Sequence, residues 1–178
     1  MEKRITDRAF FTQPAEELAK ALIGKIICHE VGNENEKFVI KARIKTTEAY
    51  RHTDDVTDAN RENENNAQLL EGGHIHLYTK KGEGRKRLDI VAGTAGTAES
   101  VLIRGLDAYV EGPQITVWAM DIDDSADGMD LLAENATICL VDDGTLVELQ
   151  EAKPRKGLSE TSNTKDELLY FTAKNFKF

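Results

Sequence analysis

The stretch FVIKARIKTTEAY, residues 38–50, alternates apolar and polar side chains and therefore predicts one long β-strand. The apolar positions on its core-facing side are Phe38, Ile40, Ala42 and Ile44. Glu48 and Tyr50 continue the same alternation, so we expect a carboxylate and an aromatic ring on that side. Burial disfavours the charged form of a carboxylate, which can tune an acid for general-base chemistry near neutral pH. The alternative is that the strand ends near Thr46 and leaves Glu48 in an exposed loop.

The size and composition of the chain are typical of one globular domain, because 40% of its 178 residues are hydrophobic. We therefore expect a single domain over residues 1–178. Cys28 and Cys139 lie in apolar runs without the spacing of a metal site, so we expect reduced core thiols, no metal and no cofactor. The sequence lacks a secretory signal and any apolar run long enough to cross a bilayer, so we expect a cytoplasmic protein with no membrane partner. We also expect a monomer.

The formal net charge of −9 argues against a broad non-specific surface for nucleic acid, because phosphate binding depends on Lys and Arg. One segment is different: residues 80–87, KKGEGRKR, carry five basic residues and one acidic residue. Strands predicted over residues 74–79 and 88–92 would make it the tip of a β-hairpin. A basic tip suits a probe of a nucleic-acid groove. The alternative is a solvated hairpin whose lysines prevent edge-to-edge aggregation.

The remaining elements follow from turn and capping signals. A helix should begin near Gln13, with Pro14 in its first turn, and end before Gly24. Further strands are predicted over residues 25–31, 101–106, 115–120, 137–141 and 168–172. The first of these would pair with the long strand as an antiparallel hairpin. Residues 53–73 are typical of a loop with one short helix, and a loop of this length is a candidate wall of a functional site.

Arg104 lies in the apolar run VLIRGL, residues 101–106. An arginine cannot lose its charge, so it requires an anion, polar partners or solvent. A salt bridge to a protein carboxylate and an anchor for a substrate carboxylate or phosphate both remain open, as does the face of the strand that it uses.

Five residues match the spacing of an EF-hand calcium loop: Asp123, Ser125, Asp127, Gly128 and Glu134. That loop requires a helix on each side. Because strands are predicted on both sides here, we do not expect calcium binding.

Seven segments follow one another along the chain, from residue 10 to residue 178. They are FFTQPAEELAKALIGKII (10–27), TTEAY (46–50), GGHIHLY (72–78), VLIRGL (101–106), ITVWAMDIDDSADGMDL (115–131), KPRKGL (153–158) and LLYFTAKNFKF (168–178). As a collinear set they resemble the alkyladenine (3-methyladenine) DNA glycosylase family, and the resemblance extends over nearly the whole chain. TEAY and VLIR are its strongest parts.

The resemblance implies an α/β (α+β) fold with a curved, mainly antiparallel sheet, flanking helices and a protruding β-hairpin. It also implies DNA as the partner, most simply a damaged duplex. The implied reaction belongs to base-excision DNA repair. A monofunctional glycosylase of this kind removes an alkylated or deaminated purine by hydrolysis, after flipping the nucleotide out of the helix.

The resemblance assigns roles to individual residues. Glu48 matches the general base that activates water for attack on C1′, and Arg104 matches an arginine beside that water. The residues expected to bind the base are Tyr50, Asp58, His76, Tyr78 and Leu102, with Tyr50 and Tyr78 stacking on it. The residues expected to hold DNA are Lys80, Lys81, Arg85, Lys86 and Arg87.

This sequence also departs from the family pattern. Asp58 replaces a base-binding histidine, which suggests a base with a donating edge. Lys81 replaces the tyrosine that wedges into the minor groove, Leu88 stands at the place of an asparagine near the pocket floor, and residues 62–65 are ENEN instead of Thr-Pro-Arg-Asn. A basic hairpin tip could compensate through phosphate contacts.

Two other functions remain open because of these departures. The first is a catalytically degenerate protein that binds DNA, a nucleotide or a protein partner on the same fold. The second is an unrelated small-molecule enzyme on a similar scaffold. A pocket too narrow for a purine between Tyr50 and Tyr78 would favour the second.

Overall fold

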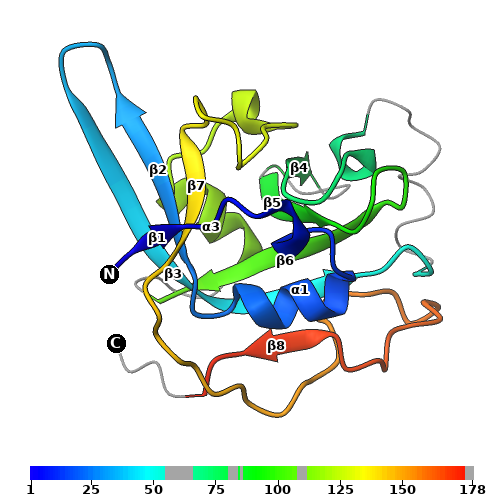
Figure 1. Ribbon diagram of the computed structural model, residues 1–178. Coiled ribbons are helices and arrows are strands. Elements are labelled where there is room, and N and C mark those ends of the chain that lie inside the picture. Colours follow the sequence, from blue (N-terminus) through cyan, green and yellow to red (C-terminus); the bar gives the residue numbers. More distant parts are fainter. Residues whose placement is uncertain (55–65, 80–83, 85, 108–111, 175–178) are drawn as a thin grey trace.

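The computed structural model describes residues 1–54, 66–79, 84, 86–107 and 112–174. Within these ranges eight strands form one sheet in the order β1-β7-β2-β3-β6-β5-β4, with β8 paired to β3 beside this path (Figure 1). The strands are β1 (Lys3–Arg4), β2 (Ile26–Gly32), β3 (Lys37–Tyr50), β4 (Ile75–Thr79), β5 (Lys86–Ala92), β6 (Glu99–Leu106), β7 (Ile138–Asp142) and β8 (Tyr170–Thr172). The helices are α1 (Ala15–Leu22), α3 (Pro113–Ala119) and the short 3₁₀ helices η1 (Arg8–Phe10), η2 (Ala67–Leu69) and η3 (Asp124–Ala126). The paired strands named here are antiparallel, so the predicted α+β class is confirmed.

The predicted strand over residues 115–120 is wrong, because most of them belong to α3. Pro113 occupies the first turn of this helix, where its missing N–H costs nothing. The hydroxyl of Thr116 donates to the main-chain carbonyl of Ile103 over 3.1 Å, which ties the helix to β6. A short apolar run does not by itself distinguish a strand from a buried helix, and here packing on β5 and β6 favours the helix.

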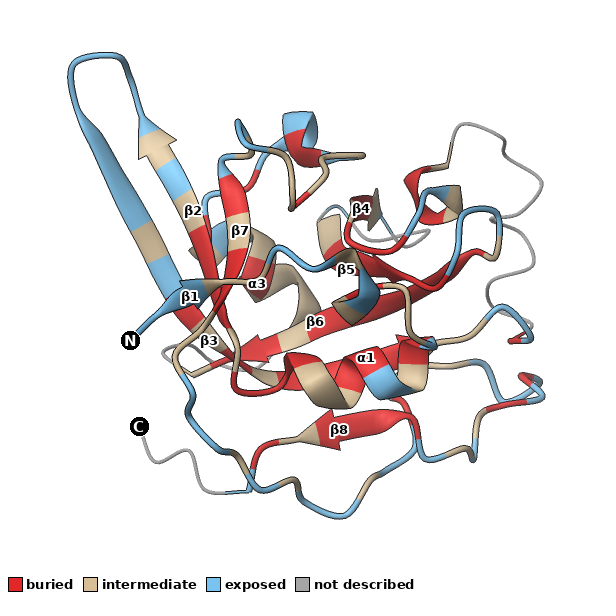
Figure 2. Cartoon of the chain, viewed as in Figure 1, coloured by how far each residue is buried: buried red, intermediate tan, exposed pale blue. Residues whose placement is uncertain are grey.

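The predicted hairpin of β2 and β3 is confirmed and projects from the body of the protein (Figure 1). Its register runs from Ile26 opposite Arg43 to Gly32 opposite Lys37. Gly32 adopts a φ of 120°, which suits glycine because it has no Cβ. The outer part of the hairpin is exposed, whereas its base lies in the core (Figure 2).

The core lies between α1 and one face of the sheet. Helix α1 carries Glu16 and Glu17 near its positive end and buries the side chains of Leu18, Ala19 and Leu22. From the sheet, the core receives side chains that alternate along β4, β5 and β6, namely Ile75, Leu77, Leu88, Ile90, Ala92, Val101 and Ile103. The opposite side chains of these strands therefore point to a second face, which carries the polar groups described below.

Strand β3 continues past Thr46, so the alternative of an early strand end is wrong. Its pairing with β6 is irregular between Ile44 and Thr47. On the far side of this irregularity the Thr47 hydroxyl donates to the carbonyl of Ala19 on α1 over 2.9 Å. Ala49 joins the same hydrophobic core.

Glu48 therefore lies on the face opposite the core, and the prediction that it shares a face with Ile44 is wrong. An irregularity of this kind shifts the period-two alternation by one residue. Phe38, which the alternation also placed in the core, is 58% exposed near the outer end of the hairpin. The irregularity in β3 gives the two halves of one strand different functions: the first half helps to build the core and the second presents Glu48.

Cys28 and Cys139 are free thiols that lie opposite each other on β2 and β7. Cys28 is buried, as predicted, but Cys139 is only half-buried. A hydrogen bond from Cys28 lowers the pKa of Cys139 to about 6. No helix in the described ranges combines the length and apolarity that crossing a lipid bilayer requires.

Candidate active site

Four neighbouring strands contribute one residue each to a row across the second face of the sheet. Glu48 on β3 pairs with Leu102 on β6, Leu102 pairs with Asp89 on β5, and Asp89 pairs with His76 on β4. Directly paired residues of antiparallel strands point to the same side of a sheet. The pairing alone therefore brings these four side chains to one face.

Three further predicted residues share this face. Tyr50, Tyr78 and Arg104 each follow a member of the row by two positions on the same strand. The fold thus gathers six residues that the sequence analysis selected from three separate segments: Glu48, Tyr50, His76, Tyr78, Leu102 and Arg104. The question of which face Arg104 uses is answered by its proximity to Glu48.

The side chain of Glu48 is completely buried and contacts hydrogen-bond donors. Its Oε2 accepts from the Tyr50 hydroxyl at 3.1 Å and from Nη1 of Arg104 at 3.3 Å. Its Oε1 lies 3.2 Å from the same nitrogen and accepts from the main-chain N–H of Lys156 at 3.0 Å. An ionised carboxylate can only accept hydrogen bonds, so this donor set matches a charged Glu48.

Tyr170 closes the β8 side of the site. It pairs with Glu48 across β3 and β8 and therefore lies on the same face. The guanidinium of Arg104 lies 5.8 Å from the centre of its ring and the ammonium of Lys156 lies 4.9 Å from it. Two cations therefore contact one aromatic ring beside the buried carboxylate.

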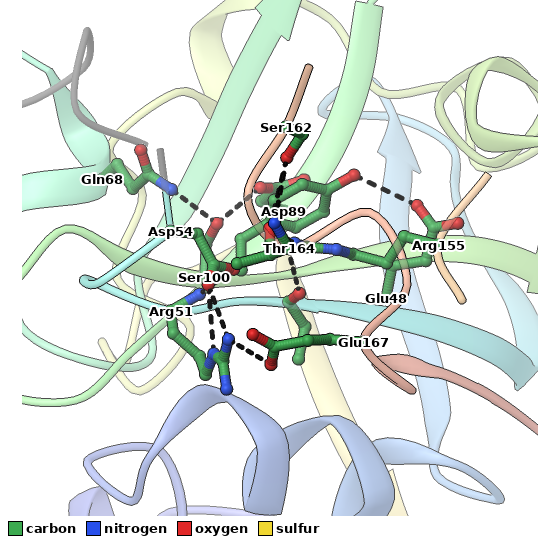
Figure 3. Close-up of polar contacts among 12 residues, drawn as sticks. Glu48, Arg51, Asp54, Gln68, Asp89, Ser100, Arg155, Ser162, Thr164 and Glu167 are labelled. Atoms are coloured by element: carbon green, nitrogen blue, oxygen red, sulfur yellow. Dashed lines mark hydrogen bonds and ion pairs between the residues drawn. The ribbon is translucent and has the colours of Figure 1, made fainter. Parts of the chain in front are cut away.

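A buried ion pair fixes the C-terminal segment against this face (Figure 3). Nη1 of Arg155 lies 2.6 Å from Oδ2 of Asp54, and both side chains are fully buried. Arg155 also donates to the carbonyl of Ala49 at 2.8 Å and to the hydroxyl of Thr164 at 2.6 Å. Asp54 receives a further hydrogen bond from Arg51 at 2.9 Å. The network places residue 156 next to Glu48.

The two tyrosines are each covered on one side by another side chain. The guanidinium of Arg155 lies 4.7 Å from the ring centre of Tyr50. The rings of His76 and Tyr78 are stacked, with centres 5.2 Å apart and an angle of 11° between their planes. Burial raises the pKa of both tyrosines well above its ordinary value, and it lowers the pKa of His76 to about 4. All three side chains are therefore neutral at pH 7.

Asp89 is a titratable group on this face that sequence reasoning missed. Its Oδ2 accepts from the Ser100 hydroxyl at 2.6 Å, and the Ser100 oxygen accepts from the amide of Gln68 at 2.7 Å (Figure 3). Its Oδ1 is buried and has no hydrogen-bond partner within the described part of the chain. Burial raises the pKa of Asp89 to about 7; the Ser100 hydrogen bond opposes this and the Glu48 charge adds to it.

Leu88, which we expected near the pocket floor, is instead fully buried in the hydrophobic core. Leu88 and Asp89 point to opposite sides of β5, so Asp89, and not Leu88, reaches the site. Of the basic residues expected to hold DNA, Lys86 pairs with Asp124 at 2.8 Å, and Arg87 lies opposite Tyr78 on the site face. Asp58, Lys80, Lys81, Arg85 and residues 62–65 lie outside the described residues.

Other contributors to the site are Gln68, Ser100, Arg155, Lys156 and Tyr170. Arg155 and Tyr170 lie in the segments KPRKGL and LLYFTAKNFKF that carry the family resemblance, and this was the available signal for them. Asp89 was detectable in principle, as an acid inside an otherwise apolar strand. Among the described residues, no group of three or more His, Cys, Asp or Glu side chains is arranged to hold a metal ion.

Comparison with known proteins identifies the family to which this arrangement belongs. The sequence model described as "Methylpurine-DNA glycosylase (MPG)" matches residues 9–116, which include β2 to β6 and most of the site. This chain belongs to the methylpurine-DNA glycosylase family. At the level of the family, it is a DNA-repair glycosylase, and the suspected resemblance is confirmed.

Individual relatives support the same family. A protein of Prosthecochloris aestuarii is 30% identical over 179 residues, which cover 88% of this chain and 83% of the relative. A protein of Clostridium novyi is 28% identical over 97% of this chain and 96% of its own length. A protein of Pseudomonas fluorescens is 32% identical over 58% of this chain, a match that spans 42% of that relative. Each is named "Putative 3-methyladenine DNA glycosylase". This chain is therefore a divergent member of the methylpurine-DNA glycosylase family.

Proposed function

We propose that this chain hydrolyses the N-glycosidic bond of an alkylated or deaminated purine that is flipped out of DNA, with Glu48 as the general base. The observation that carries the proposal is the position of a fully buried Glu48 beside Arg104 on the face that also presents Tyr50 and Tyr78. A general base, a charge partner and two aromatic rings are the groups that hydrolysis of a flipped nucleotide requires.

The two tyrosines would form the walls of the base pocket. Arg155 covers one face of Tyr50 and His76 covers one face of Tyr78, so a purine would stack on the remaining faces. Leu102 lies between the two tyrosine-bearing strands and would form the apolar floor. Stacking of a base on an aromatic side chain contributes about 1–3 kcal/mol and tolerates different bases, which suits an enzyme for several damaged purines.

The reaction proceeds by attack of water on C1′ of the flipped nucleotide. Glu48 accepts a proton from the water as the new O–C1′ bond forms. The electron pair of the C1′–N bond leaves with the purine, and the sugar remains in the DNA as an abasic site. A purine that is neutral in the DNA, such as hypoxanthine, leaves as an anion and takes up the proton that Glu48 received. A cationic methylated purine leaves as a neutral base, and Glu48 then releases its proton to solvent. Arg104 holds the Glu48 carboxylate in place through its contacts of 3.2 and 3.3 Å. General-base catalysis of this kind typically contributes 10²–10⁴-fold to the rate.

The hairpin of β4 and β5 would hold the DNA backbone. Its tip and return strand carry Lys80, Lys81, Arg85, Lys86 and Arg87. Lys and Arg contacts to phosphate position a duplex without reading its sequence. Lys81 stands at the place of the tyrosine that wedges into the minor groove in the family. Phosphate contacts from the cationic tip would take over the role of that wedge in holding the duplex. They would do so in a protein whose net charge is −9.

The proposal is tested with DNA duplexes that carry one damaged purine: hypoxanthine, 1,N6-ethenoadenine, 7-methylguanine or 3-methyladenine. Excess protein is mixed with each duplex, and free base and abasic sites are quantified over time. We expect release of at least one purine in equal amounts with abasic sites, without strand cleavage by the protein itself.

A wild-type protein that releases no base from any duplex would overturn the proposed hydrolysis. Binding to the same duplexes then separates the alternatives. Tight, salt-dependent binding would identify a DNA-binding protein that has lost catalysis. Absence of binding would mean that the family fold persists here without its function.

A further inference from the structure

Asp89 occupies the central position of the site face. In the row across the sheet it lies between Leu102 on β6 and His76 on β4. Leu102 is the proposed pocket floor, so Asp89 lies directly beside that floor. Burial raises the pKa values of Tyr50 and Tyr78, and the Asp89 charge raises both further. Both tyrosines lie on the same face of the sheet as this carboxyl group, one on each side of the row. A purine that separated the two rings would lie over Asp89.

The hydrogen bonds around Asp89 determine which of its oxygens can carry a proton. The Gln68 amide donates to the Ser100 oxygen, so the single Ser100 proton is directed to Oδ2 of Asp89. Oδ2 already receives one proton in this way. The second oxygen, Oδ1, is buried and has no partner in the described residues, so a proton on the neutral acid belongs there.

We propose that Asp89 binds the edge of the flipped purine as a neutral carboxylic acid, donating a hydrogen bond from Oδ1 to a ring nitrogen or carbonyl oxygen of the base. This inference rests on the proposed function, and it specifies the substrate: a purine that presents an acceptor on the edge next to β5. The ionised form can only accept, so it would repel the same edge.

The charged and titratable groups around Asp89 come from β3, β4 and β6 and from β5 itself. They are Glu48, Tyr50, His76, Tyr78, Arg87 and Arg104. Burial is the largest cause that raises the pKa of Asp89, to about 7. The Glu48 charge raises this pKa further, whereas the Ser100 hydrogen bond and the Arg87 charge lower it. His76 and the two tyrosines titrate far from neutral pH, and the arginines remain charged. Asp89 is therefore neutral below pH 7 and ionised above it.

The inference predicts pH-dependent recognition of the base. The probe is a DNA duplex with one 2′-fluoroarabinosyl hypoxanthine, which keeps the base but resists cleavage because fluorine destabilises positive charge at C1′. If only the neutral acid binds, the dissociation constant should rise about 10-fold between pH 6 and pH 8 for a group that titrates near 7. Binding to the same duplex with an undamaged purine provides the background, which is subtracted.

Asp89→Asn is the decisive variant, because an amide donates a hydrogen bond at every pH. It should bind the hypoxanthine duplex as the wild type does at pH 6 and keep that affinity at pH 8. Asp89→Leu should bind weakly at both pH values. Three outcomes would each overturn the inference. The wild type could bind the hypoxanthine duplex equally well at pH 6 and pH 8, or Asp89→Asn could show the same rise of the dissociation constant with pH. The third outcome is that the wild type does not prefer hypoxanthine over the undamaged purine at either pH.

Two readouts separate this inference from the proposed function. The ¹³C chemical shift of the Asp89 carboxyl carbon, followed against pH in the free protein, should show a midpoint near 7 without any DNA. A midpoint below 5 would overturn the inference even if the protein excises bases. Conversely, pH-dependent binding of the probe by a protein that releases no base from any of the four damaged duplexes would support the inference and refute the hydrolysis.

Discussion

The main-chain N–H of Lys156 donates a hydrogen bond of 3.0 Å to Oε1 of Glu48, across 108 residues of sequence. The C-terminal segment therefore supplies part of the environment of the buried carboxylate. Arg155 anchors this segment through its ion pair with Asp54 and its hydrogen bond to Ala49. A complete site thus requires the docking of residues 153–164 and β8 against β3.

Arg155→Gln should destabilise the protein by about 3 kcal/mol. The substitution leaves the carboxylate of Asp54 buried, and breaking a buried pair by removing one partner typically costs 3–5 kcal/mol. The half-buried Arg51 still contacts Asp54, so the lower end of that range is expected. Urea-induced unfolding measures the change.

Lys165→Gln is the matched control, because Lys165 forms an exposed ion pair with Glu160. Its effect should remain within about 0.5 kcal/mol. Similar effects for the two substitutions would contradict a structural role for the Arg155–Asp54 pair.

Asp89→Asn should stabilise the protein at pH 8 more than at pH 5. The Asp89 carboxyl has a pKa of about 7 in the folded protein, above the ordinary value of 3.8 expected after unfolding. The stability that this group contributes is therefore fully present below pH 3.8 and is lost as the pH rises to about 7.

The amide does not titrate, so the difference between variant and wild type should grow by about 3 kcal/mol from pH 5 to pH 8. Urea titrations at the two pH values test this, with the exposed Asp166→Asn as the control. A difference that stays constant or shrinks with rising pH would show that Asp89 is ionised throughout.

Tyr78→Ala should weaken binding to a duplex with a damaged purine by about 1–3 kcal/mol, because it removes a stacking partner of the base. Tyr78→Phe keeps the ring and should retain most of the affinity. Trp118→Ala provides an aromatic control on α3, where the ring is 75% exposed. Fluorescence anisotropy with labelled duplexes measures the three affinities. Equal losses for Tyr78→Ala and Trp118→Ala would argue against the stacking role.

Reversal of the charges of Lys81 and Arg85 to Glu should weaken DNA binding sharply and reduce its dependence on salt. Each phosphate contact that is lost lowers the slope of log K against log salt by about 0.9. Lys37→Glu, on the outward hairpin of β2 and β3, is a control for net charge. Unchanged affinity and slope in the double variant would exclude the hairpin tip as a DNA contact.

Local patterns in the sequence were sufficient to predict most of the secondary structure. The apolar alternation of residues 38–50, the polar turn before it and the signals around α1 predicted β2, β3 and the helix close to their observed bounds. The run over residues 115–120 was assigned wrongly, since its helical state depends on contacts with β5 and β6 that no local pattern encodes.

The candidate site was predicted in its residues but not in its geometry. The structure places Glu48, Tyr50 and Arg104 together, whereas the sequence analysis left the face of Arg104 open. Glu48 was assigned to the wrong face because the irregularity between Ile44 and Thr47 leaves no clear trace in the sequence. The contact of Lys156 with Glu48 depends on tertiary docking. The importance of Asp89 depends on its burial and its missing partner, and both become evident only in the folded protein.

The measurement that tests the central claim most directly is the single-turnover rate of base excision by Glu48→Gln. The amide is nearly isosteric and can still accept hydrogen bonds, but it cannot take a proton from water. Glu30→Gln, on the outer part of β2, is the control. We predict a 10²–10⁴-fold loss of rate for Glu48→Gln with little change in duplex affinity, and no loss for Glu30→Gln. Wild-type excision rates in Glu48→Gln would contradict the assignment of Glu48 as the general base.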